Sequence, residues 1–369
     1  MTLEEAKESV GRLRFPGKIF VEEHGIVLSD SNHNQILVLD FAGSVLEAVG
    51  SGRSARSDGN LERSEFNHPQ GVFREGNVIF VADTENHLIR RIDLGAKKVE
   101  TIAGTGVRGG HLDGKAPALG TALSSPWDLV KVGQELFITM AGAHQIWKLN
   151  LSRGELELFI GSGREDITDG PGASSALAQP SGITFDGTDT FYFADSEVSA
   201  IRAVDLKSRK VSTLIGRGLF EFGDQEGAWT QALLQHPLGV HYADGVLYVA
   251  DTYNDKIKAL DLKAKTIRTI AGSGTSGLQD GKPGLLYEPG GLSAREGILW
   301  IADTNNHAVR KLDLASGELS TLQIKPKEGP KLSAPQGGAG AEKPISAKRN
   351  PFLQTVQNAP EIINSSARG

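Results

Sequence analysis

The chain has 369 residues and no cysteine, so neither a disulfide nor a cysteine zinc site can form within it. Its net charge of −6 is spread along the chain, which argues against a nucleic-acid groove because such a groove needs a basic surface. No run of 18 apolar residues occurs, and the N-terminus lacks the apolar core of a signal peptide. The sequence as written therefore predicts no membrane span and a cytoplasmic protein.

Residues 1–13 are predicted to form a helical lead-in. Thr2 and Glu5 have the spacing of a capping box. The apolar positions that would share one helical face are Leu3, Ala6, Val10 and Leu13.

Six copies of one unit follow over residues 14–324. Each copy opens at a proline, at separations of 52 to 57 residues: Pro16, Pro69, Pro126, Pro180, Pro237 and Pro289. The second copy contains the runs GVFRE, VIFVAD, LIRRID and KVETIAG, which have the length and composition of strands. Four strands per unit at this period predict an all-β fold, a six-bladed β-propeller of four-stranded antiparallel blades. Residues 325–369, rich in Pro, Gly, Ala and Lys, are predicted to be a disordered tail.

The segments DTENHLIR (83–90), DTYNDKIK (251–258) and DTNNHAVR (303–310) resemble the signature of the NHL-repeat family. Over residues 14–324 the chain is most similar to the branch in which the propeller is fused to a thioredoxin-like domain, whose third blade reads much like SPWD…MAGAHQIW (125–147). The resemblance implies a six-bladed propeller and a thioredoxin-like domain or its client as a protein partner. It implies no cofactor for this chain.

An aspartate ends the second apolar run of five copies: Asp30, Asp83, Asp195, Asp251 and Asp303. We expect these side chains to accept backbone N–H bonds in the tight turn that follows. Calcium binding is the alternative, but five equivalent positions favour five equivalent turns over one metal cage. A basic column on the third strand, expected to face solvent, holds Arg90, Lys148 (one residue later), Arg202, Lys258 and Arg310.

The residues that precede the blade-opening proline are candidates for the mouth of the central channel: His68, Ser125, Gln179, His236 and Glu288. His68 and His236 belong to opposed blades and would share a metal only across a narrow channel. No metal ligand is assigned. His87, His144 and His307 share another repeat position, where a turn residue is expected more than a ligand.

The third copy departs from the repeat at several positions. Asp128 stands where most copies have glycine, Met140 replaces the aspartate, and Trp127 and Trp147 are alone in their columns. Two explanations are open, sequence drift and a specialised contact surface with Trp127, Met140, His144 and Trp147. A second aromatic group, Phe220, Phe222 and Trp229, lies in the loop 218–235, where a small core beneath the loop is the alternative.

Two functions fit these observations. The first is a non-catalytic scaffold for protein interactions, since no acid–base or nucleophile set converges. The alternative is a calcium- or zinc-dependent hydrolase or lyase with its site at the central channel.

Overall fold

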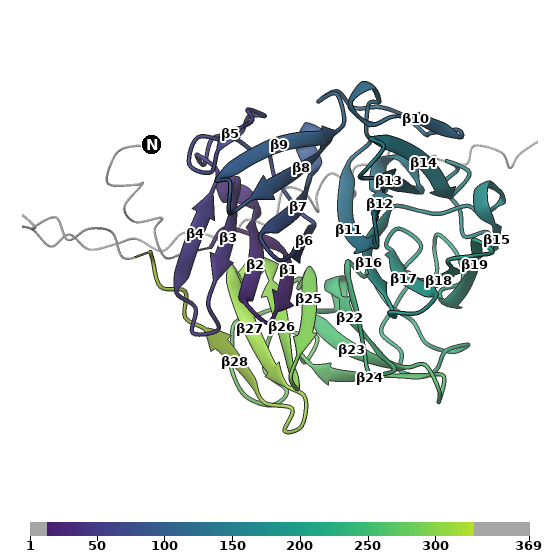
Figure 1. The fold of residues 1–369 in the computed structure, drawn as a ribbon. Helices are drawn as coiled ribbons and strands as arrows, with labels where there is room; N and C mark the ends of the chain where they lie inside the picture. The colour runs from purple at the N-terminus through teal and green to yellow at the C-terminus, as the bar shows by residue number, and fades with distance from the viewer. Residues whose placement is uncertain (1–12, 328–369) are drawn as a thin grey trace, which may run out of the picture. The chain divides into compact units, whose positions relative to one another are not determined.

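The computed structural model describes residues 13–327, which form a ring of six antiparallel sheets around a central channel (Figure 1). The six-bladed propeller predicted from the repeat is confirmed, with four long strands in each blade. The predicted helical lead-in, apart from Leu13, and the predicted tail from residue 328 onward lie outside the described residues.

The strands of each blade follow one another from the channel outward. The innermost strands are β1 (Pro16–Glu22), β6 (Val72–Glu75), β11 (Pro126–Val132), β16 (Pro180–Phe185), β21 (Gly239–Ala243) and β25 (Gly291–Arg295). The second strands are β2 (Gly25–Asp30), β7 (Val78–Asp83), β12 (Glu135–Met140), β17 (Thr190–Asp195), β22 (Val246–Asp251) and β26 (Ile298–Asp303). The third strands are β3 (Gln35–Leu39), β8 (Leu88–Asp93), β13 (Gln145–Asn150), β18 (Ala200–Asp205), β23 (Lys256–Asp261) and β27 (Ala308–Asp313). The fourth strands are β4 (Val45–Val49), β9 (Lys98–Ala103), β14 (Glu155–Ile160), β19 (Lys210–Ile215), β24 (Thr266–Ala271) and β28 (Leu319–Leu322).

The loop that enters a blade also covers its outer edge. In blades 2 to 5 this loop adds a short fifth strand that pairs with the fourth: β5 (Gly59–Asn60), β10 (Lys115–Pro117), β15 (Gly170–Pro171) and β20 (Gly227–Ala228). These strands were not predicted. They shield part of an edge whose N–H and C=O groups would otherwise be open to another chain.

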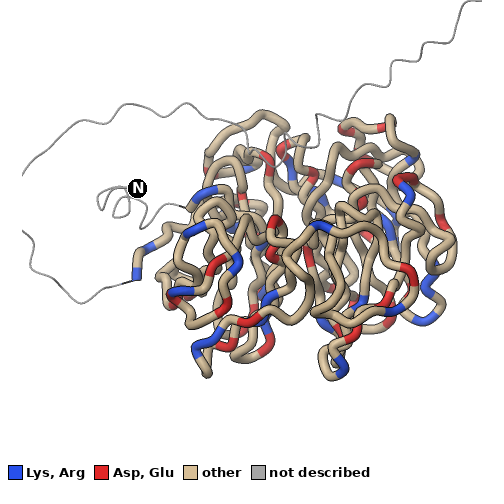
Figure 2. Tube along the Cα trace, turned by 90° about the horizontal axis from the view of Figure 1, so that it is seen from above, with Lys and Arg blue, Asp and Glu red and all other residues tan. Residues whose placement is uncertain are grey.

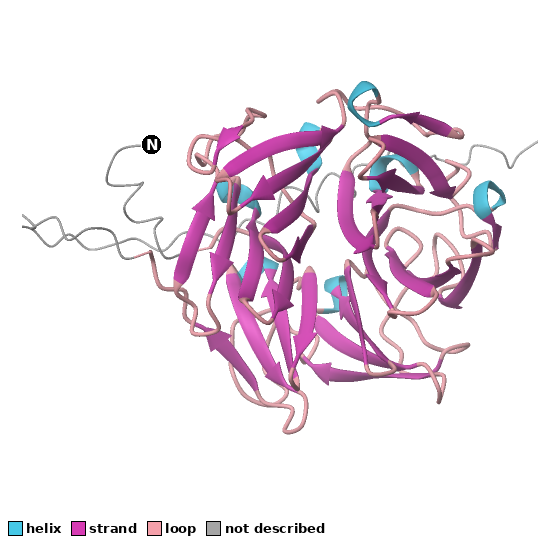
Figure 3. Cartoon of the chain, viewed as in Figure 1, coloured by secondary structure: helices cyan, strands magenta, loops and turns pink. Residues whose placement is uncertain are grey.

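Helical structure in residues 13–327 is limited to short 3-10 turns (Figure 3). Five of them join a second strand to a third: η1 (Ser31–His33), η2 (Thr84–Asn86), η4 (Ala141–Ala143), η6 (Thr252–Asn254) and η7 (Thr304–Asn306). Two more, η3 (Ala118–Gly120) and η5 (Gly172–Ser174), lie in the loops that enter blades 3 and 4.

Blade 6 and blade 1 close the ring without exchanging a strand, since each sheet is built from consecutive strands. The Thr304 hydroxyl donates to the carbonyl of Pro16 at 2.8 Å, and the Val21 N–H donates to Ser293 Oγ at 3.0 Å. Beyond β28 the chain crosses to blade 1, where the Lys325 carbonyl accepts the Val45 N–H at 3.0 Å.

The core is a set of apolar clusters between neighbouring sheets, and alternate residues of the strands contribute their side chains to these clusters. One cluster joins blade 2 to blade 3, and another joins blade 3 to blade 4 through the rings of Phe137, Phe159 and Phe191. Because each cluster needs both blades, the ring is stable only as a whole.

Candidate functional site

The aspartate column anchors the segment that enters the same blade. Asp83 Oδ1 accepts the Asn67 N–H at 2.8 Å, and Asp195 Oδ1 accepts the Ala178 N–H at 2.7 Å. Asp30, Asp251 and Asp303 do the same. None of the four aspartates that precede a 3-10 turn caps that turn with its side chain. The expected donor, a backbone N–H of the turn that follows, is therefore corrected to a backbone N–H of the segment that precedes the blade. The turn contributes a side-chain amide instead, since Asn86 donates to Asp83 Oδ2 at 2.8 Å and two other blades repeat this bond.

The second oxygen of the aspartate pairs with a buried base in four blades. Arg90 Nη1 lies 2.8 Å from Asp83 Oδ2, and Arg90 Nη2 lies 2.8 Å from Asp58 Oδ1 in the entering loop. Blades 4, 5 and 6 repeat this pair with Arg202, Lys258 and Arg310. The prediction that this basic column faces solvent is wrong for these four, whose side chains are fully buried. The carboxylate oxygens accept bonds from arginine, lysine and backbone N–H groups. They therefore do not form a set of free oxygen ligands for calcium.

Burial raises the pKa of Asp83, Asp195 and Asp303 to about 6, and the adjacent guanidinium acts in the opposite direction. Removing a carboxylate from water disfavours its charged form, while a cation at hydrogen-bond distance favours it. We interpret these shifts as the cost of a structural ion pair inside a sheet stack and not as a sign of acid–base chemistry.

Blade 3 replaces this ion pair with apolar side chains. Met140 and Trp147 hold the positions of Asp83 and Arg90, both are buried, and both belong to the core cluster between blades 2 and 3. The prediction that they form a contact surface is corrected, because their side chains point into the core. In place of the ion pair, Gln145 anchors the loop that enters blade 3. Its side-chain oxygen accepts the Leu112 N–H at 2.8 Å and the Trp147 indole N–H at 2.8 Å.

Asp128 also has an internal partner. It takes the place of a repeat glycine on β11, and Lys18 takes the equivalent place on β1. Lys18 Nζ lies 3.7 Å from Asp128 Oδ2 and donates to the Leu238 carbonyl of blade 5 at 2.5 Å. Burial lowers the pKa of Lys18 and raises the pKa of Asp128. One lysine thus joins blades 1, 3 and 5 across the axis.

At this level the glycine positions of the neighbouring inner strands have no room for a side chain. A Cβ built on Gly71 would lie 2.6 Å from Asp128 Cα, and one on Gly182 would lie 3.1 Å from Lys18 Nζ. The remaining cavity of about 180 Å³ lies among all six inner strands and contains a single imidazole, His241. Burial lowers the pKa of His241 to about 4, so this side chain is neutral at pH 7.

The predicted channel-mouth residues form a ring of hydrogen bonds between blades. Each donates its backbone N–H to the side chain of the residue just before the third strand of the preceding blade, as Ser125 does to His87 Nδ1 at 3.2 Å and Gln179 does to His144 Nδ1 at 3.2 Å. The other three pairs are His68–Asn34, His236–Ser199 and Glu288–Asp255, and Phe15, which holds this position in blade 1 and was not predicted, donates to His307 Nδ1. His87 and His144 are therefore held as neutral acceptors, and burial lowers the pKa of both.

The backbone of this ring is left-handed at every blade. The φ angles run from 45° to 59° at Phe15, His68, Ser125, Gln179, His236 and Glu288. Strain at a single non-glycine residue often marks a functional site. Here all six blades share it, which assigns it to the architecture.

The two opposed histidines differ in their surroundings. His236 is buried and stacks on Tyr253, with ring centroids 4.6 Å apart, and burial lowers its pKa to about 4. His68 is half-buried beside the Asn67 amide oxygen, 2.9 Å from its Nδ1. Within residues 13–327 no three His, Asp or Glu side chains lie close enough together to hold a metal ion.

The loop 218–235 carries the most exposed aromatic side chain of the propeller. Phe220 is 90% exposed and Phe222 is 56% exposed, whereas Trp229 is half-buried against the core of blade 5. Trp127 and His144 are also half-buried. Acidic and basic residues are mixed along the trace in Figure 2. No helix among residues 13–327 is long and apolar enough to cross a membrane.

Comparisons with known proteins agree with the repeat. The chain is 41% identical over 360 residues to NHL repeat-containing protein 2 of Homo sapiens, covering 88% of this chain and 50% of that protein. It is 42% identical over 341 residues to the chloroplastic protein SUPPRESSOR OF QUENCHING 1 of Arabidopsis thaliana, covering 86% of this chain and 32% of that protein. No protein-family model matches. The chain belongs to the NHL-repeat β-propeller family and spans half or less of the length of these two relatives.

Solved structures resemble the fold alone. A streptogramin B lyase superposes with a TM-score of 0.52 at 13% identity, covering 86% of this chain and 85% of that one. A chain of the nidogen–laminin complex superposes with a TM-score of 0.53 at 15% identity, covering 83% and 92%. An enzyme and a protein complex thus share one architecture, so this likeness does not choose between the two predicted functions.

Proposed function

We propose that this propeller is a non-catalytic scaffold that binds a protein partner through the loop 218–235, and that the partner is a thioredoxin-like domain or its client. The exposure of Phe220 and Phe222 carries this proposal. Large aromatic side chains in water are unfavourable and are enriched at the centres of protein interfaces. Leu219 beside them is 36% exposed, which extends the apolar surface.

The internal use of the other candidate groups supports the same proposal. Met140, Trp147 and Asp128 are bound within the ring, and the residues before each proline hold neighbouring blades together. The metal-dependent alternative has no ligand cluster in residues 13–327. The choice of partner comes from the resemblance to propellers fused to a thioredoxin-like domain.

The loop is anchored well enough to present its aromatic tip. Gly223 donates its N–H to the Leu234 carbonyl at 2.9 Å, and Asn254 donates to the Gly223 carbonyl at 2.8 Å. Trp229 packs against the core at the other end of the loop. An interface on a fixed loop loses little conformational entropy when it forms.

Calorimetric titration with a purified thioredoxin-like domain of the fusion branch tests the proposal. Replacing Phe220 and Phe222 together by serine is expected to weaken binding at least tenfold with an unchanged thermal midpoint. Leu278→Ser, at an apolar residue 56% exposed in the loop that enters blade 6, is the matched control. Equal affinity of the wild type and the double variant would refute the loop as the interface.

A further inference from the structure

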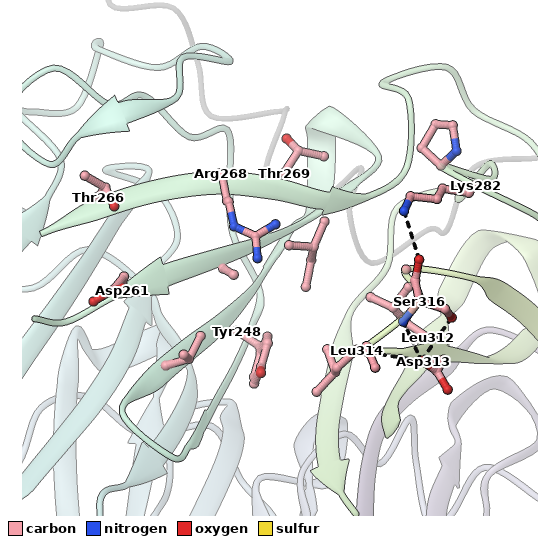
Figure 4. Close-up of a pocket in the computed structure, with 16 residues that line it drawn as sticks. Tyr248, Asp261, Thr266, Arg268, Thr269, Lys282, Leu312, Asp313, Leu314 and Ser316 are labelled. Carbon is pink, nitrogen blue, oxygen red and sulfur yellow. Dashed lines mark hydrogen bonds between the residues drawn. The ribbon is translucent and has the colours of Figure 1, made fainter. Parts of the chain in front are cut away.

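A groove of about 490 Å³ lies between blades 5 and 6, away from the channel, and neither Phe220 nor Phe222 lines it, although β20 of the loop 218–235 pairs with its strand β24. Its first wall is a row of three residues on adjacent strands of blade 5. Tyr248 on β22 pairs with Ala259 on β23, and Ala259 pairs with Arg268 on β24. Its second wall is the turn 312–317 together with Lys282. Figure 4 shows Arg268 and Tyr248 on one side of this space and Lys282 and Leu314 on the other.

The equivalent row in blade 2 is filled by an ion pair. There Phe80 pairs with Arg91 and Arg91 pairs with Glu100, and Arg91 Nη1 lies 3.0 Å from Glu100 Oε1.

Blade 3 fills the row in the same way. Lys148 lies 3.3 Å from Glu157, and Arg209 from the turn of blade 4 reaches back to the same carboxylate at 2.6 Å. In both blades a carboxylate on the fourth strand neutralises the base and occupies the space beside the next blade.

Blade 5 lacks both of these groups. Alanine at 259 leaves the space of an arginine or lysine side chain empty, and the base is found one strand further out, at Arg268. Gly317 holds the position from which Arg209 closes the gap between blades 3 and 4. These three differences produce the groove.

The groove contains unpaired positive charge. Arg268 is exposed. Among residues 13–327, neither Arg268 nor Lys282 has a carboxylate within 4.0 Å, and Lys282 Nζ donates to the Ser316 carbonyl at 2.9 Å. The acidic side chains in the walls are bound to their own turns. Asp313 Oδ1 accepts the N–H groups of Ala315 and Ser316, and Asp261 Oδ1 accepts those of two residues in its turn.

We propose that this groove binds an acidic peptide segment of a partner protein. A glutamate or aspartate of the segment enters the space beside Ala259 that the side chains of Arg91 and Lys148 fill in blades 2 and 3, and there it pairs with Arg268 and Lys282. An adjacent apolar side chain packs on Tyr248, Leu312 and Leu314. A peptide fits better than an enclosed small molecule because exposed residues line the rim on both sides, so the groove opens outward.

The inference extends the scaffold function to a second surface and rests on it only in taking a protein segment as the occupant. Its probe is a fluorescein-labelled peptide of alternating leucine and glutamate, measured by anisotropy on the full chain at 50 mM salt. We expect saturable binding that weakens with salt and at least tenfold weaker binding of the same peptide with glutamine for glutamate. Equal binding of the glutamine peptide would overturn the proposal.

Two variants locate the site. Arg268→Gln is expected to weaken binding at least tenfold. Ala259→Arg combined with Arg268→Glu rebuilds the Arg91–Glu100 row of blade 2, so it should fold with an unchanged midpoint and lose binding. Arg153→Gln, at an exposed arginine in the turn of blade 3, controls for general charge. Retained binding in both groove variants would refute the site.

Two further arms separate this inference from the proposed function. Phe220→Ser with Phe222→Ser should leave peptide affinity unchanged, and loss of peptide binding there would contradict the groove. Competition by 4-methylpentanoate as strong as that by unlabelled peptide would mean that the groove takes small carboxylates, which overturns the peptide as occupant.

Discussion

Met140 and Trp147 hold in blade 3 the two positions that a buried aspartate and a buried arginine hold in blade 2. Both halves of the ion pair are replaced together, so neither charge is left alone in the core. Removing one partner of a buried ion pair is costly, whereas replacing both by apolar groups of similar volume is often neutral. The altered third repeat is thus an alternative solution to the packing of a blade.

The same pattern connects Lys18 with Asp128. Each stands in a column of glycines, in blades 1 and 3, and each supplies the charge that the other needs inside the channel. The departures of blade 3 from the repeat therefore stabilise the ring. The surfaces that we propose for partners are the exposed loop of blade 5 and the groove between blades 5 and 6.

The first prediction transfers the blade 3 solution to blade 4. Asp195→Leu alone should lower the free energy of unfolding by about 3–5 kcal/mol, because Arg202 stays buried without its carboxylate. Combining Asp195→Met, Ala200→Gln and Arg202→Trp should recover at least half of that loss. Urea unfolding followed by tryptophan fluorescence measures both, and a triple variant no more stable than the single one would contradict the exchange.

The second prediction concerns the pair across the channel. A double-mutant cycle with Lys18→Met and Asp128→Asn should give a coupling of about 1–3 kcal/mol, because each single variant leaves one buried charge unpaired. Denaturant unfolding of the four proteins measures the coupling. Additive losses would show that the 3.7 Å pair contributes nothing to stability.

The repeat alone was enough to predict the six blades, since a proline opens every copy and an aspartate ends the second apolar run of five of them. It was not enough to predict the burial of Arg90, Arg202 and Arg310. On a strand, an arginine between apolar neighbours normally marks a solvated face. Here the side chains are buried by loops that lie about 30 residues earlier in the sequence and contain their partners Asp58, Asp169 and Asp280. Each of these aspartates is followed by a glycine, and the common spacing between this Asp-Gly pair and the arginine is a sequence signal from which the burial could have been predicted.

The candidate sites were harder to predict for a physical reason. A rare residue in a repeat can face a partner or a second rare residue elsewhere in the ring, and spacing does not distinguish these cases. Lys18 and Asp128 are 110 positions apart and meet only because the ring closes. The groove depends on small residues, Ala259 and Gly317, whose effect appears only when neighbouring blades are superposed.

The third prediction concerns pH. Burial lowers the pKa of His236 to about 4, below the value near 6.5 in an unfolded chain. Above pH 6.5 both states are neutral; as the pH falls toward 4 only the unfolded state takes up the proton, so stability is lost. Between pH 7.5 and 5 this histidine should remove about 2 kcal/mol. His236→Phe, which copies Phe15 of the same column, should lack that part of the pH dependence in urea unfolding; identical pH profiles would contradict a buried neutral imidazole.

The last prediction tests whether His144 only joins two blades or also contacts the partner. The His144 side chain accepts the Gln179 N–H at 3.2 Å, and the backbone of His144 is left-handed with a φ of 53°. Asn34 accepts the equivalent N–H in blade 1 from the same backbone conformation. His144→Asn should therefore keep full stability, since asparagine tolerates this conformation and offers an acceptor. His144→Ala should lose about 1–2 kcal/mol through the missing acceptor. Thermal unfolding measures the stabilities, and titration with the partner measures binding. A stable His144→Asn protein that no longer binds would place this histidine in the interface, whereas unchanged binding would limit it to joining blades 3 and 4.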